Sequence, residues 1–494
     1  MRLKNFGFKR KSGIIMPVAS LPSPYGIGSF GKPCIDFIDF LDKCGQKCWQ
    51  VLPLNPTSYG DSPYQSPSSF AGNPYFIDLE VLSKKGLLTK SEIKRAKTKL
   101  PKIDYGYLFN ERFNLLNKAF NRFKPNEKYN KFVKKNAYWL SNYALFMALK
   151  IKNGYKPWWE WDESDKCFKI AKKQSVKLKN EINFFKFLQF EFFEEWECVL
   201  AYAKSKKIVI IGDLPIYVAR DSVDVWSNTE EFLLDENLTP TLIAGVPPDA
   251  YSSVGQLWGN PVYDYDKMRT NGFNWWIKRI KHTKKLYDIL RIDHFRAFAG
   301  YYVIPYGEET AVNGTWKQGV GYELFNEVFK QVKGVKIIAE DLGYITNDVI
   351  ELLSHFNFPG MKVLEFAFYE ENSIYLPKNY VGENCVVYTS THDSETALEW
   401  VNTLNNEVYL RFKQATLPFT EKSNVYKLIA LALSSKSNLA LISMQDYLEL
   451  GKEARINVPN IAMGNWTWRL KSNYGTNKTI CKIKNINKKF KRIR

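Results

Sequence analysis

Eight short apolar segments, most of them ending in a polar or glycine-rich turn, constrain the fold of this chain more than any other feature. Between most of them lie stretches with helical periodicity, such as residues 34–45 and 321–334. Strands that are apolar throughout and alternate with helices belong to a parallel sheet covered on both faces. Eight such units predict an α/β fold, a (β/α)8 TIM barrel with helical insertions. The segments are residues 13–20, 48–54, 207–218, 287–295, 335–343, 361–368, 384–393 and 438–446.

The intervals between these segments are unequal in length. We expect residues 1–494 to form a single catalytic barrel, with a lysine-rich, largely helical insertion at 80–205 and a long active-site loop region at 219–263. Long loops at the catalytic face of a barrel are usually functional. The chain ends in a basic C-terminal tail, 471–494, with nine Lys or Arg and no Asp or Glu. This tail is expected to be divergent, disordered or the product of a frameshift.

The formal net charge of +19 does not by itself indicate nucleic-acid binding, because the tail carries nearly half of it. Many other lysines alternate with acidic residues, and the chain has no recognition-helix, zinc-finger or aromatic–basic motif. It also has no run of roughly 18 apolar residues that could span a membrane. Seven irregularly spaced cysteines favour reduced, buried thiols and a cytoplasmic location. We therefore expect neither a nucleic acid nor a membrane as partner.

Carboxylates stand at the ends of several predicted strands, where core packing gives no reason for them. The C-terminal ends of barrel strands form the active-site face of this fold. Two of the four histidines, His294 and His392, directly adjoin such carboxylates. The pattern indicates metal ligation, a hydrolytic triad, or carboxylate chemistry with histidines in support. The strand-end carboxylates are Asp213, Asp293, Glu340, Asp393 and Asp446.

Three of these carboxylates match the needs of glycosidic bond cleavage. Arg291 lies on the same strand face as Asp293, so it should lower the pKa of Asp293 and keep a nucleophile ionised. Glu340 ends an apolar strand, so burial should raise its pKa, as a general acid requires. Two carboxyl groups whose pKa values are shifted in opposite directions can cleave a glycosidic bond. Asp393 could hold sugar hydroxyls in the transition state. The alternatives are a structural Arg–Asp pair and a carboxylate in a surface loop.

Aromatic residues in polar segments favour a sugar ligand. The chain has 14 Trp and 29 Tyr, whose flat apolar faces and polar edges match sugar rings, although core packing accounts for most of them. Tyr59 and Tyr64 lie in a segment rich in Gly, Pro and Ser after the second strand. Trp258 and Asn260 lie in a glycine-rich loop. We expect these loops to contact substrate.

Ten ordered motifs between Gly13 and Arg469 resemble those of the 4-α-glucanotransferases (amylomaltases, or disproportionating enzymes), a glycoside hydrolase family of the α-amylase clan. Together they are far more specific than any single motif. The motifs are "LPSPYGIGSFG", "PLNPTSYGDSPYQSPSSFAGNP", "GDLPIYVARDSVDVW", "AGVPPDAYSSVGQLWGNPVYD", "RIDHFRAF", "AEDLG", "PGMKVLEFAF", "THDSET", "MQDYLELGKEARINVPN" and "GNWTWR".

The resemblance implies a role for each candidate residue. Asp293 corresponds to the nucleophile, Glu340 to the acid/base and Asp393 to the third carboxylate of the family. Residues lining the donor sugar subsite would be Asp213, Arg291, His294 and His392, and residues of substrate-contacting loops would be Tyr59, Trp258 and Asn260. Both histidines would be neutral or weakly charged hydrogen-bonding groups.

The resemblance also implies a reaction. An α-1,4 bond of a maltodextrin or starch-type glucan would be cut with retention, through a covalent glucosyl-Asp293 intermediate. The chain would pass to the 4-hydroxyl of another glucan or of glucose. No metal or organic cofactor is implied, and we expect a monomer or a weak homodimer. Retention requires Asp293 and Glu340 to stand about 5–5.5 Å apart.

Transfer rather than hydrolysis requires a bound acceptor and exclusion of water. We attribute this to residues 245–260 acting as a lid, so that Gly255→Pro should raise hydrolysis. Plain α-1,4-glucan hydrolysis by the same carboxylates remains an alternative. A non-catalytic glucan-binding protein is disfavoured because all three carboxylates are present. A metallohydrolase is disfavoured because the four histidines form no HxH or HxxE spacing.

Two departures from the family pattern lie near the expected site. Ser394 and Glu395 stand where the family more often shows "THDNDT", which brings the fine contacts of the sugar subsite into question. Glu365 replaces a commoner Gln and could add a charge near the site.

Overall fold

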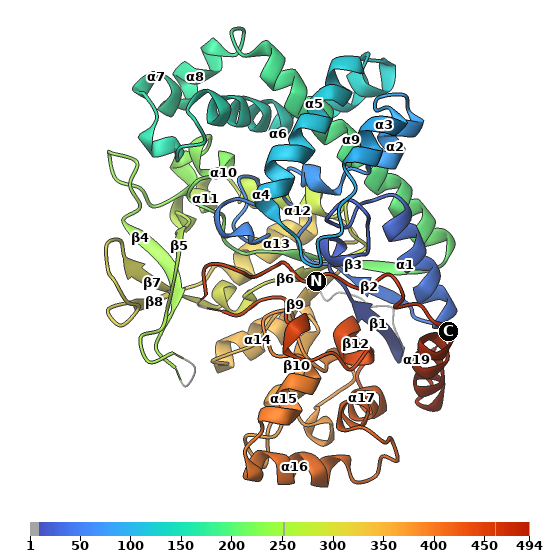
Figure 1. Cartoon of the computed structure of the whole chain (residues 1–494). Helices are drawn as coiled ribbons and strands as arrows, with labels where there is room; N and C mark the ends of the chain where they lie inside the picture. The colour runs from blue at the N-terminus through green and yellow to red at the C-terminus, as the bar shows by residue number, and fades with distance from the viewer. Residues whose placement is uncertain (1–8, 250–251, 460, 494) are drawn as a thin grey trace.

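The computed structural model describes residues 9–249, 252–459 and 461–493, and its centre is a closed barrel of eight parallel strands (Figure 1). The order around the barrel is β1-β12-β11-β10-β9-β6-β3-β2, and β12 closes onto β1 in the register Lys11↔Leu439. The predicted (β/α)8 barrel is confirmed, and each predicted segment overlaps one barrel strand. The strands are β1 Lys11–Ile15, β2 Cys48–Gln50, β3 Val209–Leu214, β6 Ile289–Ile292, β9 Ile337–Ala339, β10 Gly360–Val363, β11 Cys385–Tyr388 and β12 Leu439–Ser443.

Side chains alternate between the barrel interior and the surrounding helices. Along β6, Ile289 belongs to the cluster that fills the barrel, whereas Leu290 and Ile292 pack outward in the larger core. By the same alternation Arg291 points inward. β3 and β9 contribute Ile211 and Ile338 to the interior cluster, two residues before Asp213 and Glu340. A filled barrel floor therefore lies directly beneath the strand-end carboxylates.

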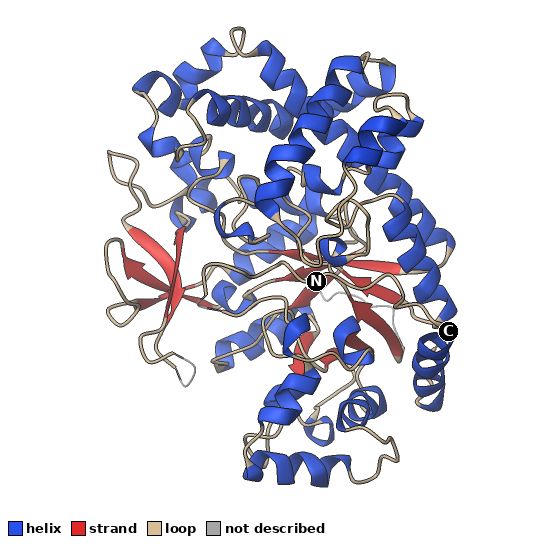
Figure 2. Ribbon diagram, in the orientation of Figure 1, coloured by secondary structure: helices blue, strands red, loops and turns tan. Residues whose placement is uncertain are grey.

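Helices pack around the barrel, and a smaller sheet stands on its left side in Figure 2. Their packing against the sheet buries one large apolar core. These helices include α1 Lys32–Lys43, α9 Lys179–Ser205, α12 Asn274–Thr283, α13 Gly321–Gln331, α14 Asn347–Phe356 and α17 Asn424–Ser434. The remainder between β3 and β12 are α10 Val223–Trp226, α11 Tyr265–Thr270, α15 Ala397–Thr403 and α16 Asn406–Thr416, and α18 Met444–Tyr447 follows β12.

Residues between β2 and β3 form a helical body above the barrel in Figure 1. Its two long helices, α6 and α9, pack through aromatic side chains, with the rings of Trp139 and Phe193 5.7 Å apart. The side chain of Asn126 caps α6 by accepting a hydrogen bond from the backbone N–H of Tyr129 at 2.9 Å. Besides α9, the helices of this body are α2 Leu79–Lys84, α3 Lys90–Arg95, α4 Tyr105–Tyr107, α5 Phe113–Arg122, α6 Glu127–Lys152, α7 Glu163–Lys166 and α8 Phe168–Ala171.

A second, antiparallel sheet of order β5-β4-β7-β8 stands beside the barrel (Figure 1). Two of its strands lie in residues 219–263, where the sequence analysis expects a loop. β4 pairs with β7 about sixty residues later, from Leu242↔Pro305 to Gly245↔Tyr302, and local patterns do not reveal such a distant partner. The glycines that suggested a loop instead allow a bulged hairpin. The strands are β4 Leu242–Val246, β5 Gln256–Pro261, β7 Gly300–Pro305 and β8 Thr315–Gln318.

The basic tail is ordered over its described part, so the expectation of a disordered end is wrong. It forms α19 (Asn477–Lys489), which buries Ile483 and Asn487 beside α1. Arg492 is fully buried, and its guanidinium donates hydrogen bonds to four backbone carbonyls. Two of them belong to Lys11, the first residue of β1, and to Ser437, two residues before β12, so the tail helps to close the barrel at its N-terminal end.

All seven cysteines lie within the described residues and none forms a disulfide. Cys34, Cys44, Cys48 and Cys385 are buried, but Cys198 and Cys481 are exposed, so the expectation that the thiols are buried is only partly right. Within the described residues, no helix has both the length and the apolar character that crossing a membrane requires.

Candidate active site at the C-terminal end of the barrel

The predicted carboxylates meet at the mouth of the barrel because three adjacent strands end in register. Asp213 pairs with Arg291 across β3 and β6. One residue beyond the strands, the backbone N–H of Asp293 donates to Leu214 O at 3.1 Å, and that of Glu340 donates to Ile292 O at 3.0 Å. The main-chain ladder thus fixes Asp293 and Glu340 at neighbouring positions of one rim.

Arg291 is the shared cation of this rim. Its Nη1 lies 2.7 Å from both carboxylate oxygens of Asp213 and 3.0 Å from Oδ1 of Asp293. The arginine and Asp213 side chains are 4% and 0% exposed, whereas Asp293 keeps 25% of its side-chain surface open. Asp213 therefore serves as the buried counter-ion, and Asp293 is the carboxylate that faces the mouth.

The pKa of Asp293 departs from the sequence expectation. Burial raises it to about 6, although the charge of Arg291 opposes the shift, and the nearby charges of Asp213 and Asp393 add to it. Within "RIDHF" only Arg291 adds a charge on the strand of Asp293, so the segment by itself predicts a lowered pKa. Asp213, from a different strand, takes two of the contacts of the guanidinium and offsets part of its charge.

Glu340 retains its proton more strongly than Asp293 does. Burial raises its pKa to about 7, with Arg291 opposing and Asp293 contributing, which confirms the predicted direction. Both carboxyl oxygens accept main-chain hydrogen bonds: Oε1 from Leu342 N at 2.9 Å, and Oε2 from His294 N at 2.5 Å. These bonds fix the carboxyl plane while burial keeps the group close to half protonated at neutral pH.

Asp393 is held ionised on the opposite side of the mouth. Burial opposes its ionisation, but the charge and hydrogen bond of His392 and a bond from Asn457 lower its pKa to about 2. His392 Nε2 lies 3.1 Å from Oδ2 of Asp393, and Asn457 Nδ2 donates to Oδ1 at 2.7 Å. Asn457 belongs to the quoted "ARINVPN" motif, but nothing in its own spacing marked it as a site residue.

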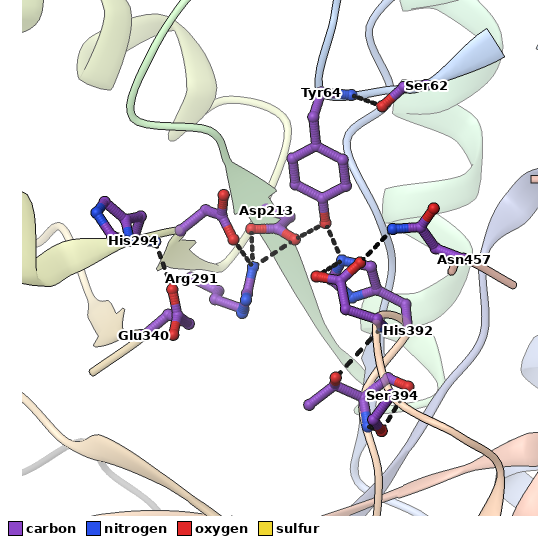
Figure 3. A network of polar contacts seen from close by, with 12 residues as sticks. Ser62, Tyr64, Asp213, Arg291, His294, Glu340, His392, Ser394 and Asn457 are labelled. Atoms are coloured by element: carbon purple, nitrogen blue, oxygen red, sulfur yellow. Dashed lines mark hydrogen bonds and ion pairs between the residues drawn. The ribbon is translucent and has the colours of Figure 1, made fainter. Parts of the chain in front are cut away.

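Tyr64 connects the two halves of the site, as Figure 3 shows. Its hydroxyl donates to Oδ2 of Asp213 at 2.7 Å and lies 2.8 Å from Nε2 of His392, from which it can accept. The chain His392–Tyr64–Asp213–Arg291 therefore runs without interruption from Asp393 to Asp293. In this segment the family resemblance assigns the substrate role to Tyr59, whose side chain lies outside the described structure, and not to Tyr64.

The pKa values of the two histidines are shifted in opposite directions. His294 is neutral, because burial and the charge of Arg296 lower its pKa to about 3. Its ring meets the indole of Trp258 edge to face, with centroids 4.7 Å apart. The pKa of His392 is instead raised: burial favours the neutral form, but the charge and hydrogen bond of Asp393 outweigh it. This shift favours a charged His392 more than the expected neutral or weakly charged state does.

Trp258 and Asn260 lie on β5, one strand of the added sheet, and both are brought to the mouth. Gln65 Nε2 donates to Oδ1 of Asn260 at 3.3 Å, and Asn260 Nδ2 donates to Val218 O at 2.7 Å. Asn260 is only 5% exposed, so it ties β5 to the loop after β3. Trp258 is partly exposed and contacts His294, so it is the member of this pair that faces the site.

Asp446 and Glu365 are buried beside the site rather than in it. Asp446 accepts hydrogen bonds from Thr389 Oγ1 at 2.5 Å, Ser390 Oγ at 2.7 Å and Ala397 N at 2.8 Å, which gives it a structural role. Glu365 is 2% exposed, and burial together with the charge of Asp446 raises its pKa well above the ordinary value. The buried site therefore favours the protonated, uncharged form of Glu365.

Gly255, the residue chosen to test the lid, lies at the turn before β5. Its φ is +69°, and a Cβ built on it would stand 2.5 Å from Val246 O. Proline requires φ near −65°. Gly255→Pro would therefore disrupt the hairpin rather than stiffen it, and a different variant is needed.

Comparisons with known proteins agree on one family. The family model described as 4-alpha-glucanotransferase matches residues 16–474. The 4-alpha-glucanotransferase of Clostridium butyricum is 47% identical over 95% of this chain and 98% of its own, and that of Aquifex aeolicus is 46% identical over 96% and 98%. The structure of the amylomaltase from Streptococcus agalactiae in complex with acarbose is 38% identical and covers 98% of this chain and 100% of its own, with a TM-score of 0.95.

Proposed function

This chain belongs to the 4-alpha-glucanotransferase family and is a glycosyltransferase acting on α-1,4-glucans, and we propose that it works by retaining double displacement at Asp293. The donors would be maltodextrins and starch-type glucans, and the acceptor would be the 4-hydroxyl of another glucan or of glucose. The observation that carries this proposal is the pair of coupled carboxyls at adjacent strand ends, with Asp293 on Arg291 and Glu340 retaining its proton.

In the first step, Asp293 would attack the anomeric carbon while Glu340 protonates the departing glycosidic oxygen. The C1–O bond to the leaving chain breaks, a C1–Oδ ester bond forms, and the proton passes from Glu340 to the leaving oxygen. The order of the two pKa values supports these roles, because at neutral pH Asp293 is the more ionised member of the pair. In the second step, Glu340 would take the proton of the acceptor hydroxyl as the ester is displaced.

Arg291 and its partners would keep the nucleophile in place and ready to react. Two contacts to Asp213 hold the guanidinium in place. Because the guanidinium cannot shift toward the substrate, its third contact keeps Asp293 correctly oriented. When Asp293 becomes an ester and loses its charge, Asp213 still balances the arginine. The cation therefore does not have to be solvated midway through the reaction, which limits reorganisation.

Asp393 and His392 would bind ring hydroxyls of the sugar in the donor subsite. Asp393 is ionised by His392 and Asn457 and keeps 46% of its side-chain surface exposed, so its carboxylate is available to a ligand. Positive charge develops on the sugar ring in the transition state, and a fixed anion at this position stabilises it.

Trp258 would favour transfer over hydrolysis by excluding water from one side of the mouth. Its indole stands against His294, one residue from the nucleophile. An ester on Asp293 that is covered by this indole would be protected from water until an acceptor sugar enters.

Incubation with pure maltotriose tests the proposal. Transfer would produce glucose together with chains of four or more glucose units, measured by chromatography, and Asp293→Asn would abolish both products. Products no longer than maltose would instead indicate hydrolysis by the same carboxylates. Retention is measured separately by the anomeric configuration of the first products, and inversion would contradict a covalent intermediate.

A further inference from the structure

A lysine-lined cavity lies at the opposite end of the barrel from the candidate active site. It has a volume of about 650 Å³ and is formed by Tyr138, Gln331, Val332 and five lysines, Lys278, Lys281, Lys284, Lys285 and Lys333. Most of these residues lie at the C-terminal ends of α12 and α13, which lead into the beginnings of β6 and β9. Tyr138 comes from α6 of the helical body.

The lysines of this cavity form no close ion pairs, although the charge of Lys278 acts on Glu231, which does not line the cavity. None of the five forms an ion pair within 4 Å with any described residue, and no Asp or Glu lines the cavity. Lys278, Lys281 and Lys284 are spaced three apart, and Lys285 is four beyond Lys281, so they project from one side of α12 and its C-cap. Like charges at this spacing repel one another.

The ordinary structural roles of surface lysines do not explain why five of them meet at one cavity. Lysines near a helix C-terminus interact favourably with its dipole, and Lys284 Nζ donates to the carbonyl of Lys333. Elsewhere on the surface some exposed lysines form ion pairs, as in Lys32–Asp36 and Lys330–Glu327, and others form none within 4 Å among the described residues. The convergence of five lysines on one cavity is therefore what distinguishes this cluster. Burial and the charge of Lys135 lower the pKa of Lys285, so a further lysine outside the cavity lining adds positive charge near it.

The cavity also offers a ring surface and a rigid wall. Tyr138 is 44% exposed, and Lys285 Nζ lies 5.8 Å from its ring centroid. Its hydroxyl is 3.0 Å from Nδ1 of the buried His282, whose Nε2 lies 2.8 Å from Phe70 O. This contact joins α6 to α12, so the two sides of the cavity are held together without a ligand. Small-ligand sites commonly have volumes of about 300–1,000 Å³.

We propose that this cavity binds an anion carrying two or more adjacent phosphate groups, an oligophosphate chain either free or attached to a nucleoside. Five cations converging on one cavity match several closely spaced negative charges better than a single carboxylate or phosphate. The exposed face of Tyr138 would stack on a base where one is present. The site is separate from the carboxylate mouth and does not depend on the reaction proposed there.

Titration calorimetry with ATP, inorganic tripolyphosphate and adenosine tests the site in the full-length protein. ATP or tripolyphosphate is expected to bind at one site per chain, more weakly as salt rises, while adenosine alone binds far less. Tighter binding of ATP would identify the nucleotide as the better ligand, and tighter binding of tripolyphosphate would identify the free chain. Absence of binding by both phosphate probes at low salt would overturn the proposal.

The double variant Lys281→Glu/Lys285→Glu should weaken binding by at least tenfold. A matched control is Lys94→Glu/Lys97→Glu, which changes two exposed lysines distant from the cavity and lowers the net charge equally. Equal weakening in both variants would show non-specific attraction and overturn the site. Maltotriose disproportionation by each variant checks that it is folded. If the Glu variant fails this check, Lys281→Gln/Lys285→Gln replaces it, with the same tenfold expectation against Lys94→Gln/Lys97→Gln.

Discussion

The backbone N–H of His294 donates a hydrogen bond to Oε2 of Glu340 across 2.5 Å, which joins the residue after the candidate nucleophile to the candidate acid/base. His294 has φ of +49° and ψ of +46°, the left-handed region that non-glycine residues seldom adopt. That conformation turns its amide toward Glu340. Such outliers persist where surrounding structure enforces them and often lie at active sites. Backbone geometry therefore positions the acid relative to Asp293.

Glu340→Gln should separate the two chemical steps. With a maltosyl α-fluoride donor the leaving fluoride needs no proton, so the Asp293 ester should form, and it should accumulate because no base activates the acceptor. We expect turnover of maltotriose to fall about 10²- to 10⁴-fold, the usual contribution of acid–base catalysis. Mass spectrometry of digested protein should find the sugar on the peptide of Asp293. A sugar adduct in Asp293→Asn treated in the same way would contradict the assignment.

The pH dependence of kcat/KM should be bell-shaped, with limbs near pH 6 and pH 7. Asp293 must be ionised, so activity falls as pH drops through about 6, and Glu340 must be protonated, so activity falls as pH rises through about 7. The two values belong to the coupled pair. Because Asp213 raises the pKa of Asp293, Asp213→Asn should move the acid limb to lower pH. An acid limb that stays in place or moves upward would refute this electrostatic account.

Tyr64→Phe should impair catalysis with little effect on the fold. It removes the hydroxyl between Asp213 and His392 but keeps the ring. Hydrogen bonds to charged groups contribute about 1.5–3 kcal/mol, so kcat/KM should fall about 10- to 100-fold. Tyr426→Phe is the matched control, because it also loses one hydrogen bond, to Tyr447 O at 2.9 Å, away from the mouth. An equal loss of kcat/KM in both variants would mean that Tyr64 has only a structural role.

Glu365→Gln should stabilise the protein increasingly as pH rises. Burial raises the pKa of Glu365 in the folded state, so the folded protein binds a proton that the unfolded chain releases above its ordinary pKa. Stability is therefore lost as pH rises from that ordinary pKa toward the folded-state pKa. The neutral amide lacks this dependence. The difference in Tm between variant and wild type should be larger at pH 8 than at pH 4, and a difference independent of pH would count against a protonated Glu365.

Gly255→Ala should raise hydrolysis relative to transfer, whereas Gly259→Ala should not. Both glycines have φ near +70°, but a Cβ at Gly255 would collide with Val246 O, whereas one at Gly259 meets nothing within 4 Å. Both variants therefore strain the backbone, but only Gly255→Ala should displace β5 and Trp258 with it. A difference between the two variants reports on that displacement. The measurement is the ratio of free reducing ends to transfer products from maltotriose. The same ratio in both variants would contradict a water-excluding role for β5.

The sequence by itself determined the barrel, because buried parallel strands are apolar along their whole length and alternate with helices, which is a local pattern. It also placed Asp213, Asp293, Glu340 and Asp393 at strand ends, where this fold concentrates its chemistry. The family motifs added the roles assigned to them. All of these signals can be read within one segment at a time.

Tertiary structure decided what depends on distant partners. The pairing of β4 with β7, the burial of Arg492 and the bridge made by Tyr64 each join segments that no local pattern connects. The charge states also depended on it, because electrostatic interactions sum over every nearby group and over burial. Arg291 alone predicted a low pKa for Asp293, but Asp213 and a buried site reversed the direction.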